Sequence, residues 1–221
     1  MKRIMLIAFT AMLAAAEYGT YFTPEENALI QAAFRSARDS NAPEAYLSAK
    51  VNEGIAKRSP SARIVTAVTN CAAKLVSAAR IADIANIPKA ERERALTLFT
   101  DAMINGLTAE DIEHIRASSG NDVIADLIRA YLTLSSYQSD AALSRTLVRT
   151  LAEKRITRTE LADIMNVIAR YDRDQLRMSR REILESVADG IRDGKRGHAL
   201  TRAVERNAES RTPLRRIKRR Q

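Results

Sequence analysis

The sequence predicts an all-α chain, and three observations support this. Aromatic residues make up only 5% of the 221 residues, with no Trp, 7 Gly and 5 Pro. This composition does not suit sandwiches and barrels, which need frequent turns and aromatic or β-branched strands. Apolar residues recur at spacings of three and four, and helix-start signals precede them repeatedly. The 46% hydrophobic and 29% charged residues are typical of a globular chain.

The first residues have the three-part pattern of a secretory signal. Met1-Lys2-Arg3 is cationic, residues 4–13 are apolar apart from one Thr, and Ala14-Ala15-Ala16 provides small residues before Glu17. We therefore expect a signal peptide over 1–16, cleaved after Ala16, and export to the periplasm or the cell exterior. The alternative is the first helix of a cytosolic protein, which would usually have one polar face.

A permanent membrane anchor is not favoured, because the apolar run is much shorter than the roughly 20 residues that span a bilayer. No later apolar stretch of that kind stands out, so we expect a mature chain without a transmembrane segment. We divide that chain into a single helical domain over 17–208 and a basic, flexible tail over 209–221.

Helix-start signals divide the mature chain into helices. Thr23-Pro24-Glu25-Glu26 combines an N-cap Thr, a first-turn Pro and an N3 Glu, and similar signals start at Ser59, Thr108, Thr157 and Ser179. Short breaks predict antiparallel helical hairpins. The expected helices cover residues 24–38, 43–57, 60–84, 90–105, 109–117, 121–135, 140–154, 158–171, 180–193 and 198–208.

A degenerate repeat accounts for the spacing of three of these signals. Ser59, Thr108 and Thr157 lie 49 residues apart, and each precedes the first apolar residue of a helix. This spacing predicts a short α-solenoid-like array with a period near 49 residues. An irregular helical bundle is the alternative, because capping signals occur at the start of any helix.

Three apolar stripes predict the buried faces of helices. Cys71, the only cysteine, lies on the first stripe, so we expect a small core residue there; the alternative is a thiol with a redox or dimerisation role. The first stripe is Ile64, Val65, Val68, Cys71, Ala72, Leu75, Val76 and Ala79. The others are Val123, Ile124, Leu127, Ile128 and Tyr131, and Leu161, Ile164, Met165 and Ile168.

Residues suited to catalysis or metal binding are few. His114 follows Glu110, Asp111 and Glu113, and a pair such as Glu110 and His114 supplies two of the three or four ligands of a zinc site. We interpret these residues as a solvated helix face. His198 lies in a cationic turn, where positive charge disfavours a metal. We therefore expect no metal site and no cofactor.

Glu185-Ser186 is similar to the catalytic segment of lytic transglycosylases, exported enzymes that use one Glu in a helical domain. No Gly- and Gln-containing substrate motif follows this pair, and no aromatic cluster is available to stack sugars. Gly-rich phosphate loops, nucleophile elbows and Cys/His metal spacings are also missing from the sequence. We therefore expect a protein that is not an enzyme.

Positive charge is concentrated at the C-terminal end. The whole chain carries a formal net charge of +9, and residues 176–221 contain 14 cations against 6 acids. The last eleven residues contain six cations and no acid. We take these six as candidate polyanion-binding residues: Arg211, Arg215, Arg216, Lys218, Arg219 and Arg220.

Two functions follow from these observations. The first is an exported helical scaffold that binds a protein or peptide through its helix surfaces. The second is an envelope-surface or polyanion-binding protein that acts through its tail on anionic lipid, lipopolysaccharide or a wall polymer. Nucleic acid is not favoured, because no aromatics are interleaved to stack bases. A tail that only increases solubility is the alternative to the second function.

Overall fold

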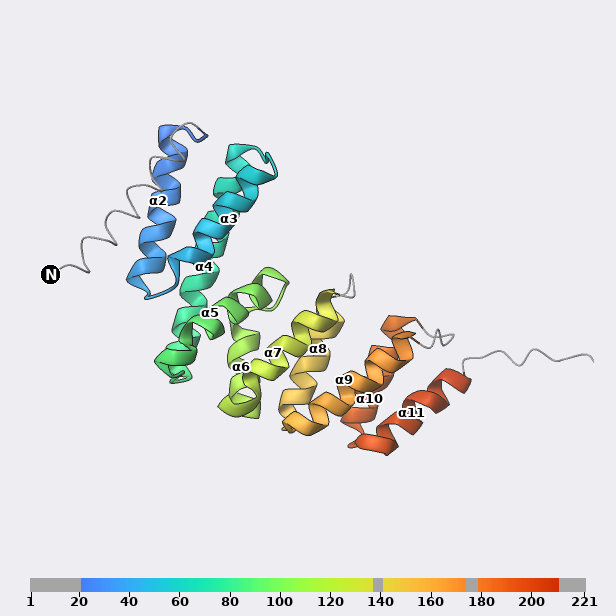
Figure 1. Cartoon of the computed structure of the whole chain (residues 1–221). Helices are drawn as coiled ribbons and strands as arrows, with labels where there is room; N and C mark the ends of the chain where they lie inside the picture. The colour runs from blue at the N-terminus through green and yellow to red at the C-terminus, as the bar shows by residue number, and fades with distance from the viewer. Residues whose placement is uncertain (1–20, 137–140, 174–178, 211–221) are drawn as a thin grey trace, which may run out of the picture. The chain divides into compact units, whose positions relative to one another are not determined.

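The computed structural model describes residues 21–136, 141–173 and 179–210. These residues form ten α-helices and no strand, so the all-α prediction is confirmed for the described part of the chain (Figure 1). Each helix lies within two residues of a range that the sequence predicts. The helices are α2 (Pro24–Asp39), α3 (Glu44–Ala56), α4 (Ser61–Ile84), α5 (Lys89–Ile104), α6 (Ala109–Ser119), α7 (Asn121–Ser136), α8 (Ala141–Glu153), α9 (Arg158–Arg173), α10 (Arg180–Arg192) and α11 (Gly197–Ser210).

The chain groups into two compact units, Met1–Thr100 and Asp101–Gln221, which we describe separately. In the first unit α2 and α3 both pack on α4. Tyr21 donates a hydrogen bond to the Ser59 carbonyl at 2.6 Å, and Ser61 donates one to Glu26 at 2.8 Å. These contacts join the start of α2 to the start of α4. The single domain expected over 17–208 stays a prediction.

In the second unit the helices form two rows. The first row is α6, α8 and α10, and the second is α7, α9 and α11; each helix contacts the next member of its own row. Contacts of α6 and α8 with α7, and of α9 and α11 with α10, join the rows (Figure 1). This arrangement brings α9, α10 and α11 together at the C-terminal end of the unit.

Six connections between helices share one backbone geometry. At the α8–α9 connection Arg155 has a φ of 49°, its N–H donates to the Ala152 carbonyl, and the Ile156 N–H donates to the Leu151 carbonyl. This is a Schellman turn, which uses a left-handed residue to satisfy the last carbonyls of a helix. The left-handed residues of the six turns are Asn41, Arg58, Asn86, Gly106, Arg155 and Gly194.

Most of the predicted N-caps are confirmed. The side chains of Thr23, Thr108, Thr157 and Ser179 each accept a hydrogen bond from the N–H three residues later, and the acidic residue there bonds back to the cap N–H. The prediction for Ser59 is wrong. Pro60 occupies the N-cap position of α4 without a side-chain hydrogen bond, because Ser59 belongs to the preceding Schellman turn, where its N–H donates to the Gly54 carbonyl.

The period of 49 residues is therefore not confirmed, since one of its three caps is not a cap. Contacts between helices recur instead at shorter separations. Glu26 to Ser61, Asp111 to Arg149 and Glu160 to Arg196 span 35, 38 and 36 residues. In each pair the acid is the N3 residue of a capping box, and its partner side chain belongs to a later helix or to the turn just before one. The residue that caps one helix therefore also joins it to another.

The predicted apolar stripes form much of the core. Cys71 is buried at 7% exposure, as expected for a small core residue, and Leu127, Ile128 and Tyr131 are fully buried. Four members of the stripes are only half-buried, because they lie at the edges of their helix faces: Val76, Val123, Met165 and Ile168.

One helix in the described residues, α4, is long and apolar enough to cross a membrane by length and composition. Its sequence predicts a helix with one buried face and not a membrane span. Half of its most apolar window is buried inside the protein, and α2 and α3 pack on it. A soluble core helix has the same properties, so α4 is weak support for a membrane span.

Candidate functional site

The tail residues that the sequence singles out, Arg211, Arg215, Arg216, Lys218, Arg219 and Arg220, lie outside the described residues, as does the predicted signal peptide over 1–16. The described helix nearest to the tail in sequence is α11, which ends at Ser210. The site is therefore built from α11 and its neighbours in the second unit.

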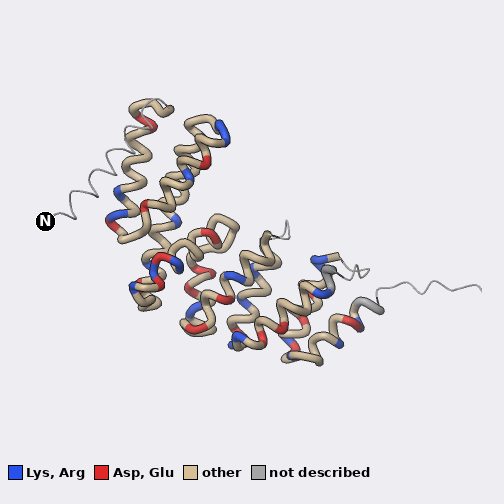
Figure 2. Tube along the Cα trace, in the orientation of Figure 1, with Lys and Arg blue, Asp and Glu red and all other residues tan. Residues whose placement is uncertain are grey.

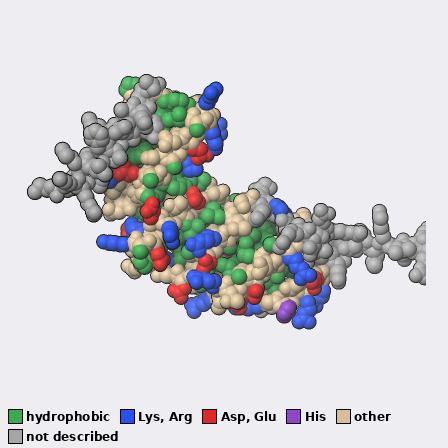
Figure 3. All heavy atoms as spheres, viewed as in Figure 1, with side chains coloured by type: hydrophobic (Ala, Val, Ile, Leu, Met, Phe, Trp, Pro, Cys, Tyr) green, Lys and Arg blue, Asp and Glu red, His purple; other side chains and the backbone are tan. Residues whose placement is uncertain are grey.

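The outward face of α11 carries three basic residues in a line along the helix. His198, Arg202 and Arg206 are four residues apart, a spacing that places them on one helix face, and all three are exposed. The large apolar residues Leu200 and Val204 lie on the opposite face and are buried. Lys and Arg side chains lie over this end of the second unit, as they do over other parts of the face in view (Figure 3), and charges of both signs occur along the described helices (Figure 2).

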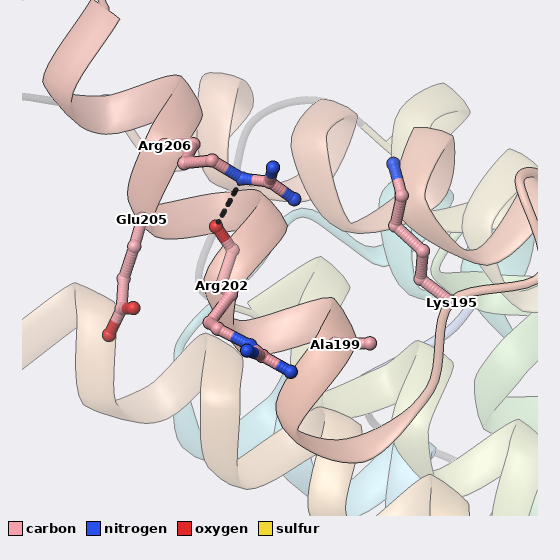
Figure 4. A pocket seen from close by; sticks show the side chains of 5 residues that line it. All are labelled: Lys195, Ala199, Arg202, Glu205 and Arg206. Atoms are coloured by element: carbon pink, nitrogen blue, oxygen red, sulfur yellow. Dashed lines mark hydrogen bonds between the residues drawn. The ribbon is translucent and has the colours of Figure 1, made fainter.

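Two hollows flank this face of α11. Lys195, Ala199, Arg202, Glu205 and Arg206 line the first, which has a volume of about 340 Å³ (Figure 4). Arg170 of α9 lines the second, together with His198, Thr201, Arg202 and Glu205. Arg202 and Glu205 belong to both, so the two hollows adjoin across the exposed face of α11.

The orientations of three side chains determine which charged groups face the first hollow. The Arg206 Nε donates a hydrogen bond to the Arg202 carbonyl at 3.2 Å, which points the rest of the guanidinium toward the side where Lys195 stands (Figure 4). Lys195 also pairs with Asp193, Nζ to Oδ2, at 2.8 Å. Glu205 points away from Arg206 and Lys195 (Figure 4). It is the only acid among the residues that line the two hollows, against four cations, so the lining is basic.

The start of α11 is held in place by Arg196. Its guanidinium pairs with Glu160 of α9 and donates a second hydrogen bond to the Lys154 carbonyl at 3.0 Å. Lys154 in turn donates to the Arg192 carbonyl at 3.2 Å. The hydrogen bond from Arg196 is the largest cause that holds the pKa of Glu160 below its usual value. These links position the hollows relative to α9 and α10.

The histidines and the Glu185-Ser186 pair do not meet in a site. His114 Nε2 lies 3.0 Å from a carboxylate oxygen of Glu153, and Glu185 pairs with Arg181 at 2.9 Å. Ser186 is buried at 3% exposure, whereas the Glu185 side chain is 38% exposed, so the two side chains do not face a common site. Within the described ranges, no three His, Cys, Asp or Glu side chains are grouped to hold a metal ion.

The second unit also contains an ionic cluster that sequence analysis missed. Asp111, expected on a solvated face, is 4% exposed and accepts hydrogen bonds from Thr108, Arg145 and Arg149. Burial raises the pKa of Asp111, but the hydrogen bonds from Thr108 and the charge of Arg145 outweigh it and hold that pKa below its ordinary value. The cluster joins α6 to α8, and the Asp111 carboxylate already accepts hydrogen bonds from three residues.

Comparisons with protein-family models, curated proteins and solved structures give no match to this chain. Charge and geometry therefore carry the functional argument. The sequence located the positive charge near the C-terminus but not the hollows, since they depend on how α11 packs against α9 and α10. The spacing of His198, Arg202 and Arg206 is the sequence signal that could have indicated them.

Proposed function

We propose that this protein is an exported, non-enzymatic helical scaffold that binds an anionic partner with its basic C-terminal end. The two basic hollows beside α11 are the observation that carries this proposal. Helices α9 and α10 hold α11 through Arg196 and Lys154, so the cations are presented on a folded support. The tail, with six more cations, follows α11 directly in sequence.

The cations of the helices and those of the tail can act together on a polyanion. Each Lys or Arg near an anionic surface contributes about 1 kcal/mol, which makes an isolated tail a weak ligand. A second contact on the folded helices raises the effective concentration of the tail at its target. The hollows beside α11 would provide that contact.

Less supports the binding of an apolar peptide by the helix surfaces. The large apolar side chains that are exposed in the described residues are Leu29, Ile84 and Ile104, which lie on α2, α4 and α5. Single exposed apolar residues are ordinary for a protein surface, whereas a peptide-binding face needs a contiguous patch. An anionic partner fits the described surface better.

The proposal is tested with the mature chain from Glu17 to Gln221 and a form that ends at Ser210. Binding to a heparin column and to vesicles with anionic lipid is measured at 0.05, 0.15 and 1 M salt. We expect the full chain to bind at low salt and to be released by 1 M salt, where the Debye length falls to about 3 Å. The shorter form should bind more weakly, and thermal melting of both forms controls for folding.

The comparison has clear contrary results. A full chain that passes through the heparin column and leaves anionic vesicles unbound at 0.05 M salt would overturn the proposal. Equal retention of both forms would remove the tail from it and leave only a solubilising role for residues 211–221. Retention that persists in 1 M salt would indicate a partner surface that is not electrostatic.

A further inference from the structure

We propose that the occupant of the two hollows beside α11 is a linear polymer of phosphate groups. This inference rests on the proposed function and names the partner class of the same site. The hollows adjoin across Arg202, and their cations come from α9, from the turn before α11 and from α11 itself. A linear anion can occupy both hollows at once, whereas a small anion fills one.

The chemistry of the lining favours phosphate. Arg202 and Arg206 present guanidinium groups, which bind phosphate oxygens through two parallel hydrogen bonds. They are four residues apart on one helix, which places their Cβ atoms about 6 Å from each other. Closely spaced phosphates on one chain can engage both groups in sequence. His198 adds a ring that can donate a hydrogen bond in the second hollow.

A lipid surface suits α11 less well. Helices that lie in a membrane interface insert large apolar residues between the headgroups. The large apolar residues of α11, Leu200 and Val204, are buried at 1% and 0% exposure against the rest of the unit. The exposed face therefore offers cations without an apolar anchor. Hollows on both flanks of a helix also suit a narrow chain better than a flat bilayer.

Glu205 limits the binding of weakly charged ligands. It lines both hollows beside Arg202, and although its side chain points away from Arg206 and Lys195 (Figure 4), its negative charge still opposes an anion that binds near it. An anion with dense charge overcomes this opposition more easily than an isolated carboxylate does, because more of its charges meet cations at once. Removal of the Glu205 charge should therefore strengthen binding and reduce the preference for dense anions.

The test uses inorganic polyphosphate of defined length, bound to the mature chain and measured by calorimetry from 50 to 200 mM salt. The double variant Arg202→Gln/Arg206→Gln removes two cations from the hollows. The control Arg181→Gln/Arg192→Gln removes two cations from α10, where they pair with Glu185 and Asp189. We expect the first to weaken binding at least tenfold and to lower the log–log salt slope by about 2, one per lost contact. The control should change affinity less than threefold, and Glu205→Gln should increase it.

Three further probes separate the possible occupants: inorganic phosphate, a poly-glutamate peptide and vesicles with anionic lipid. Polyphosphate that binds no more tightly than poly-glutamate, or than the vesicles, would overturn the assignment. So would equal affinities of the Arg202→Gln/Arg206→Gln variant and its control. If those two agree while a chain ending at Ser210 loses binding, the hollows are not the site and the proposed function stands. If the mature chain binds none of these probes at 50 mM salt and is not retained by heparin, both proposals fail.

Discussion

Asp111 at the start of α6 accepts a hydrogen bond of 3.1 Å from the guanidinium of Arg149 in the middle of α8. The same carboxylate completes the capping box with Thr108. A single buried side chain thus accepts a hydrogen bond from the N-cap amide of one helix and ties that helix to the next helix of the row. Glu160 and Arg196 repeat this relationship between α9 and the start of α11.

We predict that Asp111→Asn destabilises the second unit by about 1–3 kcal/mol, because the cap weakens and two guanidinium groups lose their carboxylate. Arg145 and Arg149 are each more than a third exposed, so water limits the cost. Chemical denaturation of the mature chain at neutral pH measures the change. Glu160→Gln, which alters an exposed capping box, is the matched control and should cost less. Equal losses would show that burial of Asp111 adds nothing to the cap.

Asp111 also predicts a loss of stability in acid. Its folded-state pKa lies below the ordinary value of 3.8, so the ionised form stabilises the fold at pH values above the unfolded pKa. That contribution is lost as the pH falls through the folded-state pKa. The difference in unfolding free energy between the wild type and Asp111→Asn should therefore shrink between about pH 5 and pH 2. A difference that stays constant over this range would contradict a lowered pKa.

The apolar stripes predict which residues the core needs. Leu127 of α7 and Ile164 of α9 are 0% and 3% exposed, so we expect Leu127→Ala and Ile164→Ala each to cost about 2–5 kcal/mol, depending on how far the site collapses. Met165→Ala serves as a control, because Met165 lies at the half-buried edge of the same stripe as Ile164 and should cost less. Losses within error at both buried sites would show that the stripes are not core.

Helix positions were predictable because their signals are local. Thr23, Thr108, Thr157 and Ser179 each specify a helix start through residues within one turn, and the apolar stripes follow at once. The prediction for Ser59 is wrong because a Ser before a Pro has the sequence of a cap. Ser59 instead belongs to a turn in which Arg58 has a φ of 53°. Gly adopts this conformation easily, so a Gly would have indicated the turn, whereas an Arg at this position does not.

The burial of Asp111 and the hollows beside α11 could not be predicted in the same way. Asp111 is one of several acids at the start of α6; its N3 position predicts a capping role, but its burial depends on the approach of α8. Arg170 and Arg202 lie 32 residues apart in the sequence, and their shared hollow exists because α9 packs against α11. Such sites depend on tertiary packing, which capping signals do not specify.

The predicted signal peptide gives a direct test of export. The described fold starts with Tyr21, which is hydrogen-bonded to Ser59, and Phe22, which is buried at 5% exposure. Cleavage after Ala16 would leave these contacts intact, because Glu17 and the three residues that follow it still precede Tyr21. We expect N-terminal sequencing of the protein from its native cell to begin at Glu17. An intact Met1 in the cytosolic fraction would overturn export and the envelope partners that depend on it.

The close approach of α3 and α4 depends on Gly54. A Cβ at this position would lie 2.6 Å from Ile64 Cγ1 and 2.9 Å from its Cδ1, and Ile64 is only 3% exposed. Ala is a better helix former than Gly by about 1 kcal/mol, so propensity alone predicts that Gly54→Ala stabilises α3. Overpacking opposes this gain at a cost of about 1–3 kcal/mol, because Cγ1 is anchored directly to the branched Cβ and has little freedom to move.

We therefore predict that Gly54→Ala is destabilising in the wild type and neutral or stabilising in an Ile64→Ala background, where the opposing atoms are gone. Urea denaturation of the four proteins in this double-mutant cycle measures the coupling between the two positions, which should be about 1–3 kcal/mol in favour of the double variant. Additive effects would mean that Ile64 moves aside without cost. A stabilising Gly54→Ala in the wild type would mean that α3 and α4 lie further apart than the structure has them.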